Sequence, residues 1–317
     1  MDCLYCKYVG SRGLLMSCDR KSPIPVPDFD GLNPALYEDI SEQNQILHVC
    51  PQALKRFVDK VLPFLSKPFI LLTNNSDWTI PDDVQHEFEI LTNHPRLTHW
   101  FAQNCVVDHP KLTRIPIGLD YHTLAPTRKQ MFAWSQPEKH PWGVKVDPTT
   151  QEQTLLQFQS LSKPFWEREP KAYANFQFLM TTRYGKVDRV ECLNTVPKDL
   201  VYYEPTKCIR ATCWGNMINH AFVLSPQGNG LDCHRTWEAL CLGCIPILKT
   251  SGLDPLFEGL PVWIVSAWSE VTRENMVSKI NELKGKDFQI ERLSLNFWQR
   301  LIRHRAGERT GTEGNST

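Results

Sequence analysis

Short apolar runs alternate with helix-spaced apolar residues along most of this chain. Two apolar runs, residues 45–49 and 69–73, flank residues 52–65, in which apolar side chains recur every three or four positions. A strand, a helix and a second strand in this order predict a right-handed parallel unit. Further strands are expected over residues 98–103 and 112–117.

The second half restarts this alternation after a stretch rich in proline, residues 124–170, which we take as the domain connection. One helix is expected within that stretch, over residues 152–161. A chain of 317 residues accommodates two α/β domains of similar size. The predicted fold class is therefore α/β, with two doubly wound parallel sheets facing a cleft. The other expected elements are strands over 175–181, 220–225, 244–248 and 262–265, and helices over 186–193, 233–242, 274–283 and 290–304.

Composition narrows the class of protein. Lys plus Arg and Asp plus Glu both number 35, and this balance argues against a general nucleic-acid binder, which needs a basic field. No stretch reaches the apolar length of a membrane span, and the longest apolar run near the N-terminus is Gly13–Met16. We therefore expect a protein without a secretory signal that stays in the cytoplasm. Its eleven cysteines are expected to be thiols, because that compartment is reducing. No second pair at suitable spacing completes a zinc site with Cys3 and Cys6.

The segment Phe222–Leu248 contains the strongest chemical signal. A buried strand ends at Ser225, and the loop that follows contains Gly228 and Gly230, which permit close approach of a ligand. A helix then begins near Asp232 with an apolar stripe on one face. Its free N–H groups and positive dipole end point toward the mouth of the sheet, which makes a site for a diphosphate. Two glycines alone are weak evidence, and the whole order of features raises the signal.

This segment resembles the signature of the exostosin-like glycosyltransferase family. The turn Asn74–Asp77 and the stretch Thr113–His122 are similar to the other half of that family, and the resemblance covers most of residues 45–300. It is closest to short virus-encoded members, among them a xylosyltransferase. The resemblance implies a GT-B fold of two Rossmann-like domains, inversion at the anomeric carbon, and no obligatory metal or other cofactor. It also implies a UDP-sugar donor, best UDP-xylose, a glycan acceptor, and residence in the host cytoplasm if the protein is viral.

Within this resemblance the domains are expected to divide the two substrates. Residues 1–148 would form an N-terminal acceptor-binding domain and residues 149–288 a C-terminal domain that binds the nucleotide sugar. Residues 289–305 would form a helix that crosses back to the first domain, and residues 306–317 a disordered tail.

The donor-binding candidates lie on the helix and the turn before it. Glu238 is suited to accept hydrogen bonds from the ribose hydroxyls; the alternative is that it is a solvated carboxylate paired with Arg235. Arg235 suits the diphosphate or a bracing role, and His234 reaches the phosphates or lies on the surface. Asp232 would hold sugar hydroxyls or cap the helix, and Ser225 would donate to phosphate or simply end the strand.

Two further arginines are candidates for the leaving group. A nucleoside diphosphate gains negative charge as it departs, so an enzyme without a metal needs Arg or Lys beside it. Arg183 is the first choice and Arg189 the second, ahead of Lys186, with solvated surface charge as the alternative for each.

An inverting transfer also needs a base for the acceptor hydroxyl. Asp77 is the best candidate, because it follows an apolar strand of the first domain beside Asn74, Asn75 and Ser76, which are suited to bind sugars. The alternative is that Asp77 forms an Asx turn, in which case Asp120 or His94 would be the base.

Two other functions compete with a transferase. A carbohydrate-binding protein without catalytic activity would keep the acceptor cleft and lose donor binding, which the presence of Arg235 and Glu238 disfavours. A dehydrogenase is excluded, because no G-x-G-x-x-G follows an early strand.

Overall fold

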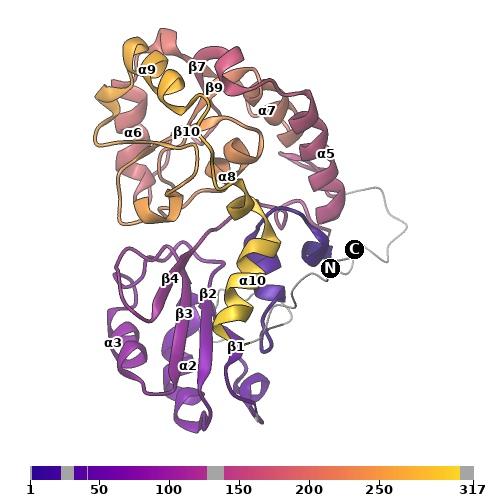
Figure 1. Ribbon diagram of the computed structural model, residues 1–317, viewed down its shortest axis with the longest axis vertical. Coiled ribbons are helices and arrows are strands. Elements are labelled where there is room, and N and C mark those ends of the chain that lie inside the picture. The colour runs from indigo at the N-terminus through magenta and orange to yellow at the C-terminus, as the bar shows by residue number, and fades with distance from the viewer. Residues whose placement is uncertain (1, 23–31, 41, 127–138, 308–317) are drawn as a thin grey trace, which may run out of the picture.

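The computed structural model describes residues 2–22, 32–40, 42–126 and 139–307. These residues form two lobes, each built around one parallel sheet, with helix α10 beside the lower lobe (Figure 1). A short antiparallel ribbon joins β5 (Lys139–His140) to β6 (Gly143–Val144). Two α/β domains with parallel sheets that face each other are the GT-B arrangement, so the predicted fold class is confirmed.

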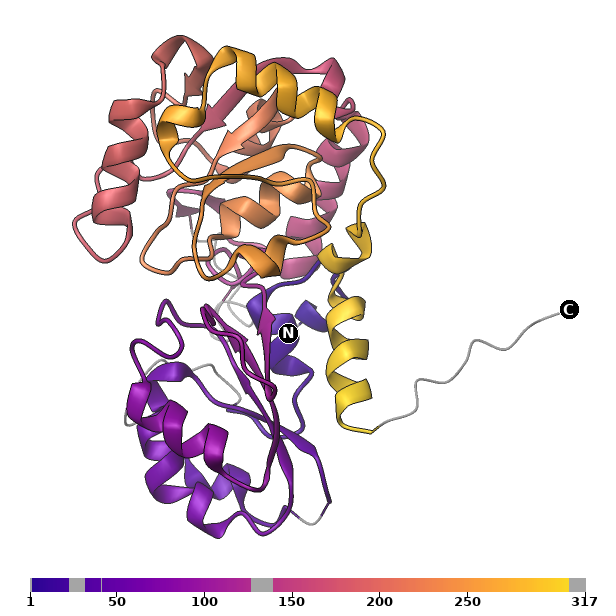
Figure 2. The ribbon, with the colours of Figure 1, turned by 60° about the vertical axis from the view of Figure 1, so that its left-hand side comes forward.

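The first lobe contains four parallel strands in the order β1-β2-β3-β4. Successive strand residues point to opposite faces of the sheet. Ile70 therefore packs in the same hydrophobic cluster as Leu14 on one face, and Leu71 packs with Phe57 on the other. Helices α2 and α3 cover one face, and α1 and α10 cover the other (Figure 2). The strands are β1 (Gln45–His48), β2 (Phe69–Thr73), β3 (Leu97–Gln103) and β4 (Leu112–Ile115), and the helices are α1 (Ser11–Met16), α2 (Leu54–Lys60) and α3 (Gln85–Asn93).

The second lobe contains five parallel strands in the order β11-β10-β9-β7-β8. The strand order reverses direction between β7 and β9, which makes a topological switch point there, the place where open α/β sheets bind ligands. The strands are β7 (Glu169–Ala174), β8 (Val201–Tyr203), β9 (His220–Leu224), β10 (Ile245–Lys249) and β11 (Trp263–Val265). The helices are α5 (Pro148–Leu161), α6 (Gly185–Thr195), α7 (Arg210–Met217), α8 (His234–Cys241) and α9 (Arg273–Leu283).

The strand predicted over residues 175–181 is wrong. The strand here is β7, which ends at Ala174, and most of residues 175–184 form a loop that leads to α6. Ala172, Tyr173 and Ala174 are fully buried between β8 and β9, whereas Leu179 is 81% exposed. The apolar residues after β7 pack as a loop cluster, with the rings of Phe176 and Phe178 edge to face.

The last described helix lies on the first lobe (Figure 1). A 3-10 turn at Ile290–Leu293 is followed by α10 (Leu295–Arg305), whose N-cap is Ser294. Arg303 pairs with Asp19 at 2.8 Å, so the C-terminal helix is tied to the N-terminal segment. Residues 308–317, most of the predicted tail, lie outside the described residues.

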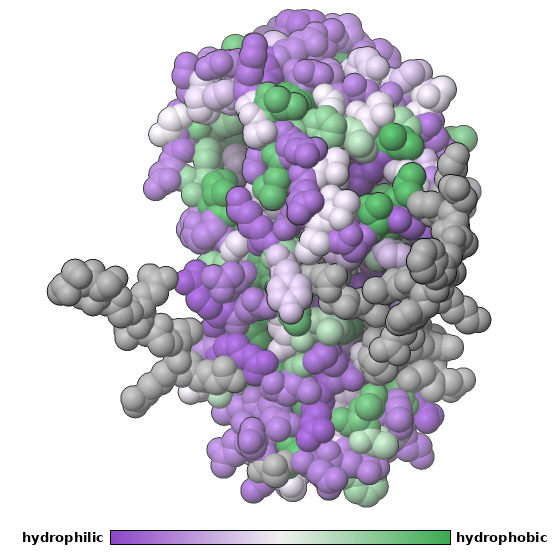
Figure 3. All heavy atoms as spheres, turned by 90° about the vertical axis from the view of Figure 1, so that its right-hand side faces the viewer, coloured by the Kyte–Doolittle hydropathy of each residue, from purple (hydrophilic) through white to green (hydrophobic). Residues whose placement is uncertain are grey.

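The surface in Figure 3 mixes hydrophilic and hydrophobic side chains over both lobes of the visible face. Within the described part of the chain, no helix is both long and apolar enough to cross a bilayer.

Candidate functional site

Loops from the carboxyl ends of both sheets meet between the lobes. Nδ2 and Oδ1 of Asn104, which follows β3, contact the carbonyl of Ser76 at 3.2 Å and the backbone N–H of Asp232 at 3.0 Å. The side chain of Asn104 thus joins the loop after β2 to the loop after β9. Nδ1 of His234 lies 2.7 Å from the carbonyl oxygen of Gly118, which follows β4. The lobes are therefore closed on each other at the edge where such sheets present ligands.

The two predicted glycines allow this close approach. A Cβ at Gly230 would lie 2.9 Å from Nδ2 of Asn104 and 3.4 Å from Oδ1 of Asp77, both in the other lobe. A Cβ at Gly228 would lie 3.1 Å from Nη2 of Arg189. The loop is therefore tight at both glycines, and the candidate donor segment lies directly against Asp77.

Asp232 connects the lobes and does not cap the helix. Its carboxylate accepts hydrogen bonds from the backbone N–H of Ile117 at 2.7 Å and from the indole N–H of Trp237 at 2.8 Å. The N-cap of α8 is Cys233, which makes no side-chain capping bond. Burial raises the pKa of Asp232 to about 6. Both carboxylate oxygens already have partners, so this residue holds the start of α8 against β4.

Arg235 lies in the first turn of α8 with part of its guanidinium unsatisfied. The group stacks on Phe176 at 5.1 Å from the ring centre. Its Nη1 is buried and has no hydrogen-bond partner among the described residues. Burial lowers the pKa of Arg235 to about 10, so it remains a cation. A buried donor without a partner costs about 1–3 kcal/mol, so this nitrogen favours an anion brought by a ligand.

Glu238 lies one turn further along α8. Its Oε1 is 3.8 Å from Nε of Arg210, and its side chain is 13% exposed. Burial raises the pKa of Glu238, and Arg210 opposes that rise. The predicted pairing with Arg235 is replaced by one with Arg210, a residue of α7 that the sequence did not indicate. Arg210 also donates to the carbonyl of Asp120 at 2.6 Å and to its carboxylate at 3.0 Å.

The two arginines predicted for the leaving group are already engaged. Arg183 has a left-handed backbone (φ 48°) and an ion pair of 2.6 Å with Asp83 of the other lobe. Arg189 is buried and donates to the carbonyls of Gln227 and Gln177, each at 2.9 Å. Arg183 thus fastens the two lobes together, and Arg189 holds the loop after β9.

The hydroxyl of Ser225 joins two elements of the second lobe. Its hydroxyl shares a buried hydrogen bond of 2.8 Å with the hydroxyl of Thr236. Together they tie the end of β9 to the first turn of α8.

Asp77 is exposed at the boundary between the lobes, at the end of a braced turn. Gln103 donates to the carbonyl of Ser76 at 2.8 Å and accepts from the backbone N–H of Asn75 at 3.1 Å. Asn74 does not face a sugar site, because it is fully buried and bonded to His48 and to the carbonyl of Ser11. The turn therefore fixes Asp77 opposite Gly230.

The reserve bases are less suitable. His94 lies between the end of α3 and the start of β3, at the amino edge of the sheet and away from the cleft. Asp120 lies in the cleft. Burial alone would raise its pKa, but His234, His122 and Arg210 outweigh burial and hold the pKa of Asp120 well below its usual value. It is therefore a paired carboxylate with little basicity.

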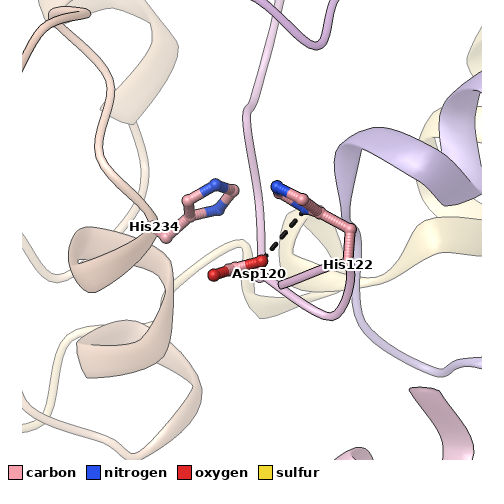
Figure 4. Close-up of side chains that lie close together, drawn as sticks. All are labelled: Asp120, His122 and His234. Carbon is pink, nitrogen blue, oxygen red and sulfur yellow. Dashed lines mark ion pairs between the residues drawn. The ribbon is translucent and has the colours of Figure 1, made fainter. Parts of the chain in front are cut away.

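Asp120, His122 and His234 form a cluster that the sequence did not predict. Figure 4 shows the carboxylate between two imidazoles, with His234 coming from the start of α8. Each residue has one ligand atom within 4.8 Å of the others, which is near enough for a cation. The guanidinium of Arg210 on the same carboxylate disfavours a metal there. Their contacts join segments more than a hundred positions apart, so no local pattern could reveal them.

The site and fold together define a two-domain α/β protein with a closed cleft and a cationic helix start. No family model matches the chain, and no curated protein matches it in sequence. Among solved structures it is similar to OtsA without ligand, with a TM-score of 0.40 and 10% identity, over 88% of this chain and 76% of that one.

Two further solved structures are similar to a comparable degree. One, from E. coli, is described as trehalose-6-phosphate bound with UDP-2-fluoro glucose, with a TM-score of 0.40 and 10% identity over 89% of this chain and 78% of that one. The other is the glycotransferase of kitacinnamycin, with a TM-score of 0.32 and 12% identity over 86% and 74%.

Proposed function

We propose that this protein is a glycosyltransferase that moves a sugar from a nucleotide-sugar donor to a hydroxyl of a glycan acceptor, with inversion and without a required metal. One observation supports this most strongly. The buried Nη1 of Arg235 lacks a partner among the described residues, at the start of α8 beside the switch point of the second sheet. A guanidinium and a helix N-terminus at such a point fit a diphosphate.

The donor would lie along α8. The diphosphate would bind Arg235 and the free N–H groups of the first helical turn. The ribose would lie one turn further along, where both oxygens of Glu238 can accept from neighbouring hydroxyls. Arg210, 3.8 Å from Glu238, helps to keep that carboxylate charged despite its burial.

The acceptor would bind on the first lobe, with Asp77 as the base. Its carboxylate removes the proton of the acceptor hydroxyl while that oxygen attacks the anomeric carbon from the side opposite the diphosphate. The glycosidic bond forms as the bond to the diphosphate breaks, which inverts the configuration. The approach of Asp77 to Gly230 supports this role, because it brings the base beside the donor loop.

The charge of the departing diphosphate would be met by protein groups. Arg235 and the positive end of α8 provide a fixed cationic environment, so a divalent metal is not needed for this step. UDP-xylose is the first donor to test, on the resemblance of the donor segment to virus-encoded xylosyltransferases.

A thermal-shift screen of nucleoside diphosphates and their sugars, with EDTA present, tests donor binding. A ligand that binds only the folded state raises the melting temperature, and a hundredfold excess over Kd stabilises by about 2.7 kcal/mol. We expect UDP and a UDP-sugar to stabilise the wild type and an Arg300→Met control, whose side chain is exposed on α10, but not Arg235→Met. If no nucleotide shifts the wild type while oligosaccharides do, the alternative of a carbohydrate-binding protein is correct.

A further inference from the structure

Two histidines, one from each lobe, meet in the closed cleft. His122 follows β4 in the first lobe and His234 begins α8 in the second, with ring centres 5.5 Å apart. Figure 4 shows both rings beside the carboxylate of Asp120. Because each lobe supplies one ring, the pair exists only when the lobes are closed.

Their hydrogen bonds determine which nitrogen of each ring carries a proton. Nδ1 of His122 lies 3.0 Å from Oδ1 of Asp120, and Nδ1 of His234 lies 2.7 Å from the carbonyl oxygen of Gly118. A carbonyl and an ionised carboxylate can only accept, so both Nδ1 atoms carry the hydrogen. A ring that carries only this one hydrogen has a bare lone pair on Nε2, and neither Nε2 is hydrogen-bonded to a described residue.

Two guanidinium groups, balanced by two carboxylates, lie around the pair of histidines. Arg12 of α1 lines one small pocket with His122, and its Nε is buried without a partner among the described residues. Arg210 of α7 is paired with Asp120, and Glu238 of α8 lies 3.8 Å from Arg210. Asp232, which precedes α8 and has a pKa raised by burial to about 6, interacts with His234 as well. The buried Nε of Arg12 lacks an acceptor among the described residues, so it is available to donate to a ligand that carries one. A bare Nε2 can donate to such a ligand only after it gains a proton.

We propose that His122 and His234 together bind the donor diphosphate across the closed cleft, and that the pair takes up a proton from solvent as the diphosphate binds. This inference rests on the proposed function and adds a binding role for two residues in it. The imidazolium N–H then donates to a phosphate oxygen beside Arg12, and the diphosphate links the two lobes. His122 comes from the acceptor-side lobe, so donor binding would itself favour closure.

The energetics make the uptake measurable. The pKa of His122 is lowered to about 4, chiefly by burial, with His234, Arg12 and Arg210 acting in the same direction and Asp120 opposing them. The free ring is therefore neutral near neutral pH, and a bound dianion raises its pKa. Between those two pKa values donor affinity rises as the pH falls, by up to about tenfold for each pH unit.

The test is calorimetry with UDP-glucose and UDP-xylose in EDTA, in two buffers of different ionisation enthalpy. The diphosphate of a sugar nucleotide is a diester that does not titrate near neutral pH, so any proton taken up belongs to the protein. We expect an uptake of about half to one proton at about pH 7. We also expect binding to be roughly tenfold tighter at about pH 6 than at about pH 8.

Two variants and a control identify the titrating groups. His122→Gln and His234→Gln keep an amide where Nε2 lies but cannot bind a proton, so each should lose the uptake and most of the pH dependence. His304→Gln, an exposed histidine on α10, should behave as the wild type. Binding without proton uptake, or uptake that persists in both site variants, overturns this inference and leaves the proposed function intact. If no UDP-sugar binds the wild type, the proposed function fails first.

Discussion

Replacing Glu238 by alanine should remove most of the affinity for UDP while leaving the fold nearly as stable. The side chain is 13% exposed, and its one ion pair with a described residue is the long contact of 3.8 Å to Arg210. Arg210 keeps its bonds to Asp120, so it is not left without a partner. Because burial raises the pKa of Glu238, the protein bears a cost to keep it charged, and truncation relieves that cost.

The expected loss follows from what the carboxylate would do for the ribose. A hydrogen bond to a charged group contributes about 1.5–3 kcal/mol, which corresponds to a tenfold to roughly hundredfold rise in the Kd of UDP. Calorimetry of wild type, Glu238→Ala and Glu238→Gln measures this directly, and the glutamine variant should lie between the other two. The melting temperature without ligand is the control for folding. A folded Glu238→Ala variant with wild-type affinity for UDP would refute the ribose assignment.

Three other predictions follow from the same contacts. Asp77→Asn should lower turnover by about a hundredfold or more with UDP affinity nearly unchanged, and near-normal turnover would pass the role of base to another group. Asp83→Asn should weaken the ion pair with Arg183, which is worth only about 0.5–1 kcal/mol because the two side chains are 29% (Arg183) and 28% (Asp83) exposed. Small-angle scattering without donor should then show a larger radius of gyration, and an unchanged radius would show that other contacts hold the lobes together. Asp232, whose pKa is raised to about 6 by burial, binds its proton more tightly folded than unfolded. Its contribution to stability should therefore fall as the pH rises from about 4 to about 6, and chemical denaturation of wild type and Asp232→Asn across that range should show this fall only in the wild type.

The elements that were predicted well are those whose burial is complete. Residues 69–72 and 221–224 are apolar without interruption and lie between helices on both faces of their sheets, so sequence and structure agree there. The strand at β7 was misplaced because its outer half, Glu169–Lys171, is polar and the apolar residues after it look more like a strand. Helix α7 was missed because its eight residues carry few apolar side chains at helical spacing.

The candidate site divides in the same way. Arg235, Glu238 and the two glycines lie within one short segment, so a local pattern was enough to indicate them. Arg12, His122 and Arg210 come from three distant segments that only the closed fold brings together. Arg183 was predicted to meet the leaving diphosphate and Asp232 to hold sugar hydroxyls or cap the helix, whereas the structure engages both with the other lobe. A sequence pattern shows the type of a side chain and cannot show which partner it finds across a cleft.

The release of UDP from UDP-sugars tests the central claim most directly. Wild type and Asp77→Asn are incubated with UDP-xylose and UDP-glucose, with EDTA throughout, and with and without a panel of oligosaccharide acceptors. We predict slow release of UDP by the wild type alone, faster release with an acceptor, and a product whose new linkage has the inverted anomeric configuration. In Asp77→Asn, the rate of UDP release should fall only where an acceptor is present, and the rate of product formation should fall with it. Binding of UDP-sugars without any release under all these conditions would contradict the account and show a binding protein.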